Sequence, residues 1–236
     1  MRILVSCLQG LPDHPIPAYG QWRRYFKNGI EEAGHEFLEV EGVDWAEALV
    51  STDPHRIAQW RADVWERTLG FVRRQHHRLS IHLFLSYLYP PQVDAGAIRQ
   101  IQSLGIPCVN FFCDNVREFR TAPREFRVFD LNWVPEVEAL PMYRKAGLPH
   151  LCLPMPCWVP QEYRLPSAEE TEPPTFIGRG DILRRNLFAR ALLAGADFQI
   201  CGPGWDDRGQ PASPAKRRLS VIVANQLIQV KRHGLA

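Results

Sequence analysis

Short, almost uninterrupted apolar runs alternate with segments of helical spacing along most of this 236-residue chain. Strand-like apolar runs are expected at 2–8, 36–40, 80–89, 107–113, 129–134 and 150–155. Helical patterns are expected at 21–34, 54–78, 95–105 and 136–147, the last broken or tilted at Pro141. Such alternation favours parallel βαβ units, and near-continuous apolar strands favour a sheet covered on both faces. The sequence therefore predicts an α/β domain with a Rossmann-like parallel sheet.

A polar segment at 161–174, with three prolines and four glutamates, interrupts this alternation. Its composition is typical of a linker. The alternation then restarts with a strand at 175–177, a helix at 182–194 and a strand at 198–201, and helical spacing returns at 215–233. We therefore predict an N-terminal Rossmann-like domain at 1–160, a linker at 161–174, and the start of a second Rossmann-like domain at 175–236.

Composition and charge exclude several classes of protein. The chain is 45% hydrophobic and 23% charged with a formal net charge of +2, which gives no indication of nucleic-acid binding. No apolar stretch reaches the roughly 20 residues that span a bilayer, and the N-terminus lacks a signal-peptide core. The sequence thus predicts a cytoplasmic protein without a transmembrane segment. Its six cysteines are expected to be reduced, and their spacing does not favour zinc.

A turn rich in glycine and arginine follows the strand expected at 175–177. Glycine lets the backbone approach a ligand closely, a helix start offers free N–H groups to an anion, and arginine adds a forked positive charge. A second glycine turn follows the strand expected at 198–201. The residues predicted to bind a diphosphate are Gly178, Arg179, Arg184, Arg185, Gly202, Gly204 and Trp205. The alternative for the arginines is a solvated, basic first turn of a helix.

Further polar residues follow strands of the first domain, at the end where parallel α/β sheets bind ligands. Gln9 and Gly10 open one such loop, and His14 within it is either a general base or an ordinary loop histidine. Asp114 and Asn115 follow the strand at 107–113. Asp114 is either a base that faces an acceptor or a cap of the next helix.

Other conspicuous residues have simpler structural interpretations. Glu136 follows a strand and a proline, and it is expected to cap the helix that it opens. Trp60, Trp65 and Phe71 have helical spacing and are expected to pack into the core rather than to form a platform for a sugar. Trp205, which follows Gly204, is instead expected to line a binding cleft.

In order and spacing, three segments resemble the GT-B glycosyltransferases, and more narrowly the CgeB-like (spore-maturation-type) family. The first is 105–115, a strand that closes on Asp114. The second is 130–136 together with the downstream 143–147. The third combines the Phe-Ile-Gly-Arg turn at 176–179 with the Cys-Gly-Pro-Gly-Trp turn at 201–205.

The resemblance implies an enzyme that transfers a sugar from a nucleotide-diphosphate donor to an acceptor hydroxyl. It implies that the first domain holds the acceptor and that the second holds the donor, with Arg179 and Arg184 or Arg185 near the diphosphate. It implies no metal and no cofactor, since the nucleotide-sugar is a co-substrate and basic side chains neutralise the leaving group. The acidic donor motif of the family has no counterpart after Trp205. The resemblance therefore implies a shortened homologue, a fragment, or a donor domain that a partner completes, and it leaves open whether the chain is active alone.

Two other interpretations stay open. One is a non-catalytic binding or partner module that keeps the fold without the chemistry. The other is a different α/β enzyme, such as a nucleotide-sugar epimerase, because fold resemblance alone does not define function. The apolar stripe from Leu219 to Val230 either packs inward or joins another subunit.

Overall fold

Six parallel strands form the centre of the first unit, Met1–Arg164, within the part of the chain that the structure describes. The structure is a computed structural model that describes residues 1–7, 18–47, 53–164, 173–178, 180, 182–202 and 204–205. The strands are β1 (Arg2–Cys7), β2 (Glu36–Leu38), β3 (Leu83–Tyr87), β4 (Cys108–Phe111), β5 (Leu131–Trp133) and β6 (His150–Leu151).

The strands are arranged in the order β2-β1-β3-β4-β5-β6. The chain therefore builds the sheet in one direction from β1 to β2, and in the other direction from β3 onwards. This reversal places a topological switch point between β1 and β3, where Cys7 lies beside Tyr87 in the parallel register. The predicted α/β class with a parallel, Rossmann-like sheet is confirmed for the first unit.

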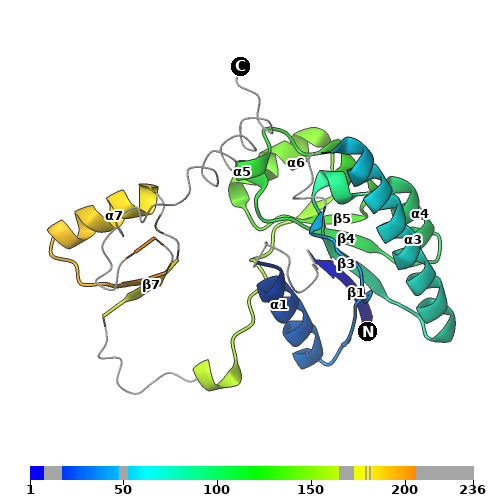
Figure 1. Cartoon of the computed structure of the whole chain (residues 1–236), viewed down its shortest axis with the longest axis horizontal. Helices are drawn as coiled ribbons and strands as arrows, with labels where there is room; N and C mark the ends of the chain where they lie inside the picture. The colour runs from blue at the N-terminus through cyan, green and yellow to red at the C-terminus, as the bar shows by residue number, and fades with distance from the viewer. Residues whose placement is uncertain are drawn as a thin grey trace. The chain divides into compact units, whose positions relative to one another are not determined.

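Helices cover both faces of this sheet (Figure 1). The α-helices of the first unit are α1 (Ala18–Glu32), α3 (Pro54–Arg78), α4 (Ala95–Gln102), α5 (Asn115–Glu118) and α6 (Leu140–Ala146). Its 3₁₀ turns are η1 (Pro90–Gln92), η2 (Arg124–Val128), η3 (Val137–Ala139) and η4 (Gln161–Tyr163). Helix α1 lies on one face, and α3 and α4 lie on the other. The Asp53 side chain caps α3 by accepting from the backbone of His55, and Pro54 follows at the first helical position.

Aromatic side chains fill the interface between α1 and the sheet. Trp22 and Phe26 of α1 pack against Phe111 of β4, with ring centroids 5.3 and 5.8 Å away. Phe111 in turn contacts Trp133 of β5 at 5.0 Å, and Trp22 contacts Tyr87 of β3 at 5.3 Å. Because large aromatic rings bury much apolar surface, this cluster supplies a large share of the stability of the first unit.

The opposite face has its own aromatic core, between α3 and the sheet. Trp65 of α3 packs on Trp45 at 5.1 Å and on Phe84 of β3 at 6.1 Å. Its indole N–H donates to the carbonyl of Gln92 at 2.8 Å. The Gln92 amide donates in turn to the carbonyl of Trp45. The expected core role of Trp65 is thus confirmed, and the buried Gln92 joins two loops that flank the sheet.

Two predicted elements differ from the structure near the end of the first unit. The strand predicted at 150–155 ends at Leu151, because the chain leaves the sheet before Pro154 and has only β5 beside it. The single helix predicted at 136–147 is η3 followed by α6. Pro141 lies in the first turn of α6, where its missing N–H leaves no bond unmade. Proline therefore marks the start of this helix rather than a break within it.

The chain that follows β6 is attached to α1. The indole N–H of Trp158 donates to the Glu32 carboxylate at 2.8 Å. Arg164 donates to both oxygens of the same carboxylate, and these bonds lower the pKa of Glu32 to about 2. The turn η4 lies within the segment predicted as a linker, so at least its first residues have a defined conformation.

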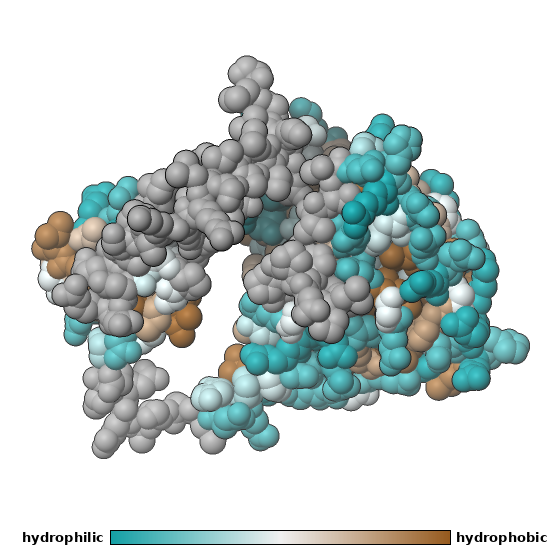
Figure 2. Space-filling model, in the orientation of Figure 1, coloured by the Kyte–Doolittle hydropathy of each residue, from teal (hydrophilic) through white to brown (hydrophobic). Residues whose placement is uncertain are grey.

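The second unit, Leu165–Ala236, contains one βαβ arrangement within its described residues. Strand β7 (Thr175–Ile177) and strand β8 (Gln199–Cys201) are parallel and are joined through α7 (Ile182–Leu193). Its described core comprises Phe188, Ile200 and Trp205. Several large apolar side chains stay exposed in this unit, including Ile177 and Leu193 at 80% and 89%, and brown patches mark such residues in Figure 2.

The helix predicted at 215–233 lies outside the described residues. Among the helices that are described, none combines the length and the apolar character needed to cross a bilayer.

Candidate functional site

The carboxyl ends of the strands in the first unit gather the polar residues that the sequence singles out. Asp114 lies three residues beyond Phe111 of β4, and Glu136 lies three residues beyond Trp133 of β5. Because Phe111 and Trp133 are paired in the register, the two carboxylates occupy equivalent positions on neighbouring strands. Residues 8–17, which include the predicted Gln9, Gly10 and His14, lie outside the described residues.

The Asp114 carboxylate is held from one side and open on the other. Its Oδ2 accepts a hydrogen bond from the Tyr87 hydroxyl at 3.3 Å. Its Oδ1 lies 3.8 Å from the guanidinium of Arg117, and the side chain is 32% exposed. Asp114 occupies the N-cap position of α5, yet its side chain makes no capping bond there. A carboxylate positioned in this way has an oxygen available to accept a proton from a bound hydroxyl group.

Glu136 supplies the cap that Asp114 does not. Its Oε2 accepts from the backbone N–H of Asn115 at 2.6 Å, and its Oε1 lies 3.4 Å from the N–H of Val116. These N–H groups belong to the first turn of α5, where a negative charge is favourable. The prediction that Glu136 caps the helix that it opens is wrong, since it makes no capping bond to η3. It caps a helix that precedes it in the chain.

Asn115 is buried, and its side-chain amide is used within the fold. The amide N–H donates to the carbonyl of Phe112 at 2.7 Å. The amide oxygen accepts from the hydroxyl of Tyr143 of α6, also at 2.7 Å. These bonds tie the end of β4 to α6. The structure therefore gives Asn115, a predicted residue of the acceptor-side loop, a buried supporting position behind Asp114.

Three residues around Asp114 were missed by the sequence interpretation: Tyr87, Tyr89 and Cys113. The hydroxyl of Tyr87 lies 3.4 Å from the Cys113 sulfur as well as near Asp114. Burial raises the pKa of the Tyr89 hydroxyl to about 12 and that of the Cys113 thiol to about 11, and it raises the pKa of Tyr87 further. The phenol of Tyr87 therefore keeps its proton and donates a hydrogen bond to Asp114. Two tyrosines at the end of a buried strand are the signal that could have identified this cluster.

The buried side-chain amide of Asn110 supports the same edge of the sheet. The Oδ1 of Asn110 accepts from the Ser86 hydroxyl at 2.8 Å and from the backbone of Leu88 at 3.0 Å. Its N–H donates to the carbonyl of Leu88 at 3.2 Å. Asn110 therefore fixes the chain that leaves β3 just after Tyr87, which holds the tyrosine hydroxyl in place.

In the second unit, the two glycine turns approach each other closely. The N–H of Gly178 donates to the carbonyl of Cys201 at 2.9 Å, and its carbonyl accepts from the Trp205 indole at 3.0 Å. Gly202 has a φ of 126°, and a Cβ at this position would lie 2.4 Å from the Gly178 carbonyl oxygen. Glycine is required at 202 for two reasons, the left-handed φ and the close contact.

The two described arginines of the predicted diphosphate site lie at the start of α7. The guanidinium of Arg184 lies over the ring of Phe176 at 5.7 Å. Arg185 is half-buried and donates from Nη2 to the carbonyl of Gly204 at 3.1 Å. Its Nε is buried without a hydrogen-bond partner among the described residues. Arg179 lies outside the described residues.

Trp205 lies in the core of the second unit, not in an open cleft where it was expected. It is 8% exposed and packs edge-on against Phe188, with centroids 5.9 Å apart. The ring is held by its bond to Gly178, so its role on this edge is to connect the two glycine turns. The two glycine turns, Arg184, Arg185 and the start of α7 thus lie together in this unit, with Trp205 behind them.

All six cysteines carry free thiols. In the described part of the chain, no three His, Cys, Asp or Glu side chains gather as a metal-binding group. The chain matches no family model and no curated protein sequence.

Proposed function

We propose that this chain is a GT-B-type glycosyltransferase homologue, of the CgeB-like kind, that transfers a sugar from a nucleotide-diphosphate donor to an acceptor hydroxyl. The observation that carries the proposal is the second unit's edge. There, two glycine turns meet beside the start of α7, and Arg184 and Arg185 lie in its first turns. Such an arrangement suits an anionic diphosphate, because glycine admits close approach and the helix start and arginines supply positive charge.

The first unit supplies the acceptor side in this proposal. Asp114 acts as the general base and accepts the proton of the acceptor hydroxyl. The acceptor oxygen then bonds to the anomeric carbon of the sugar, as the bond from that carbon to the diphosphate breaks. The diphosphate leaves with the bonding electrons, and the arginines stabilise its charge. The Tyr87 hydroxyl holds Asp114 through a hydrogen bond at 3.3 Å. Asn110 bonds the backbone of Leu88 and so fixes the chain next to Tyr87.

Calorimetric titration with nucleoside diphosphates and their sugar conjugates tests the donor side. We expect the intact chain to bind at least one of them, and Arg184→Ala to weaken that binding about tenfold or more, as expected for a lost charged hydrogen bond. Arg190→Ala is the matched control, because Arg190 is an exposed arginine in the last turn of the same helix. Absence of binding to every compound, with the chain folded by circular dichroism, contradicts the proposal.

A second candidate function is a binding or partner module that keeps this fold without transferase chemistry. A specific observation favours it: the Gly178 N–H, the Gly178 carbonyl and one N–H of Arg185 are already bonded within the unit. A donor must then use other N–H groups or displace the bond between Arg185 and Gly204. Sugar transfer or donor hydrolysis by the purified chain excludes this candidate.

A further inference from the structure

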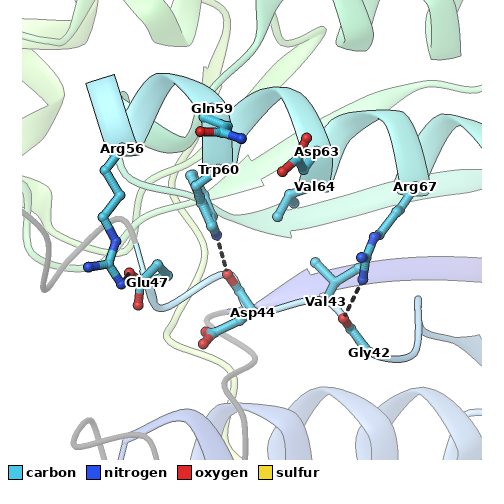
Figure 3. Close-up of a pocket in the computed structure, with 10 residues that line it drawn as sticks. All are labelled: Gly42, Val43, Asp44, Glu47, Arg56, Gln59, Trp60, Asp63, Val64 and Arg67. Atoms are coloured by element: carbon cyan, nitrogen blue, oxygen red, sulfur yellow. Dashed lines mark hydrogen bonds and ion pairs between the residues drawn. The ribbon is translucent and has the colours of Figure 1, made fainter. Parts of the chain in front are cut away.

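A cavity of about 330 Å³ lies between the first half of α3 and the segment 42–47 that follows β2 (Figure 3). Val43 and Val64 line it and are almost fully buried, at 5% and 6% exposure. They give the cavity an apolar base that belongs to the core of the first unit. The volume is within the range of small-molecule sites, which are roughly 300–1,000 Å³.

The wall of this cavity is held in a fixed conformation by three hydrogen bonds. The indole N–H of Trp60 donates to the carbonyl of Asp44 at 2.7 Å, and Arg67 donates to the carbonyl of Gly42 at 3.2 Å. The Asp44 carboxylate accepts from the backbone of Ala46 at 3.0 Å through Oδ1. Because the aromatic ring and the carboxylate are both fixed by the backbone, they need little rearrangement to hold a ligand.

Two further polar side chains of the wall have no hydrogen-bond partner among the described residues. Gln59 and Asp63 stand one turn apart on α3, and neither side chain makes a hydrogen bond within the described residues. Arg56, in the first turn of α3, forms an ion pair at 2.5 Å with Glu47 of the facing segment. The cavity therefore offers donors and acceptors to a ligand from α3 and from the facing segment (Figure 3).

The mixture of charges selects the chemical class of the ligand. A cation is repelled by the guanidinium groups of Arg56 and Arg67. An anion is repelled by the carboxylates of Asp44 and Asp63. A neutral molecule with several hydroxyl groups uses both sets, since each hydroxyl donates to a carboxylate and accepts from an arginine or amide. The half-buried Trp60 ring adds an apolar surface for the C–H groups of such a molecule. A sugar ring has both features.

We propose that this cavity binds a neutral sugar unit, with Asp44, Gln59 and Asp63 as its polar contacts and Trp60 as its apolar one. The residues involved do not include Asp114 or the arginines of α7. The inference therefore goes beyond the proposed transferase activity, and it holds or fails independently of donor binding.

Nuclear magnetic resonance on the intact chain tests the proposal. The probes are the methyl glycosides of glucose, galactose, mannose and N-acetylglucosamine, with ethanolamine and inorganic phosphate as charged comparisons. The indole N–H signal of Trp60, assigned from Trp60→Phe, and the amide signals of Gly42 and Asp44 report binding. We expect saturable shifts of these signals with at least one glycoside at millimolar concentration, and none with either charged compound.

Matched variants locate the site without disturbing the fold. Asp63→Asn changes an exposed side chain, and we expect it to weaken glycoside binding about tenfold, the effect of losing one charged hydrogen bond. Glu66→Gln makes the same chemical change one position outside the cavity wall, and binding should be unchanged. The proposal is overturned if no glycoside shifts the Trp60 signal, if only a charged compound does, or if Asp63→Asn and Glu66→Gln act alike.

Discussion

The carboxyl ends of the two parallel sheets differ in how much of their polar capacity the fold already uses. In the first unit, Asp114 is held by Tyr87, and its side chain is still 32% exposed. In the second unit, the Gly178 carbonyl is bonded to Trp205, and Arg185 is bonded to Gly204. The same βαβ arrangement therefore leaves more polar capacity unused at the edge of the first unit than at the edge of the second.

The difference follows from the cores behind the edges. The first unit has aromatic clusters on both faces of its sheet, so its edge residues rest on rigid strands. The described core of the second unit is small and includes Trp205, so that one side chain serves both packing and the edge. In a small unit each buried ring carries a larger fraction of the stability. We therefore expect the second unit to be the more sensitive to change.

The largest effect is expected from Trp205→Ala. Loss of a buried tryptophan lowers the free energy of unfolding by about 3–5 kcal/mol. This is a large fraction of the total stability of a small unit. Hydrogen exchange read by mass spectrometry should show loss of protection in β7, α7 and β8, with the first unit still protected. Trp205→Phe keeps an aromatic ring in the core and should lose less protection. Equal loss in both units would show that they do not differ as described.

A smaller effect is expected from Gly202→Ala. The variant combines an unfavourable φ with a Cβ only 2.4 Å from the Gly178 oxygen, and it should cost about 2–4 kcal/mol. Gly195→Ala is the matched control, because Gly195 also has a positive φ but an added Cβ meets nothing within 4 Å. Its cost should be only about 1–2 kcal/mol. Urea denaturation followed by tryptophan fluorescence compares the two, and similar midpoints would argue against the close contact.

Alkaline pH should destabilise the first unit selectively. Burial raises the pKa of Cys113 from 9.0 to about 11 and that of Tyr89 from 10.0 to about 12. The folded state therefore holds these protons more tightly, and its stability is complete below pH 9 and declines as the pH rises towards 12. Between its ordinary pKa and its raised pKa, each such group lowers the free energy of unfolding by about 1.4 kcal/mol per pH unit.

The second unit contains no tyrosine, so it serves as an internal comparison. Hydrogen exchange at several alkaline pH values, corrected for the intrinsic exchange rate, should show the first unit opening progressively. Phenolate absorbance should rise in two steps, with exposed tyrosines ionising before Tyr89. A single step near pH 10 would contradict the burial of the tyrosine cluster.

The smallest effect is expected from Glu136→Gln. The variant removes the charge that caps α5 through Asn115, and loss of a cap costs about 0.5–2 kcal/mol. Glu138→Gln is the control, because Glu138 lies exposed on η3 in the same turn. Thermal unfolding of both variants should separate them, and equal midpoints would mean that the cap contributes nothing.

Local signals made much of the first unit predictable. Near-continuous apolar runs predicted the strands, and helical spacing predicted α3 from residue 54 to residue 78, because these patterns depend only on neighbouring residues. The same holds for Gly34 and Gly147, which have positive φ where helices α1 and α6 end. The glycine turns and arginines of the second unit were also recognisable by their spacing.

The remaining features depend on contacts between distant residues. Glu136 caps a helix about twenty positions earlier in the chain, and Trp205 reaches back to Gly178. Neither contact leaves a local pattern, so capping was assigned to the wrong helix and the tryptophan to an open cleft. Tyr87 and Asn110 were read only as strand residues, because their roles need the neighbouring β4 strand. The order of strands in the sheet therefore decides which side chains lie together at its carboxyl end.

In the proposed reaction, Asp114 takes a proton from an acceptor while a nucleoside diphosphate departs. The most direct test of this reaction is release of nucleoside diphosphate from a panel of nucleotide-sugars, with and without alcohol acceptors, by the intact chain and by Asp114→Asn. We predict acceptor-dependent release that falls about 10²-fold or more in Asp114→Asn, the usual effect of losing a general base. Release that is unchanged in Asp114→Asn, or no release from any donor by the folded chain, would contradict the account.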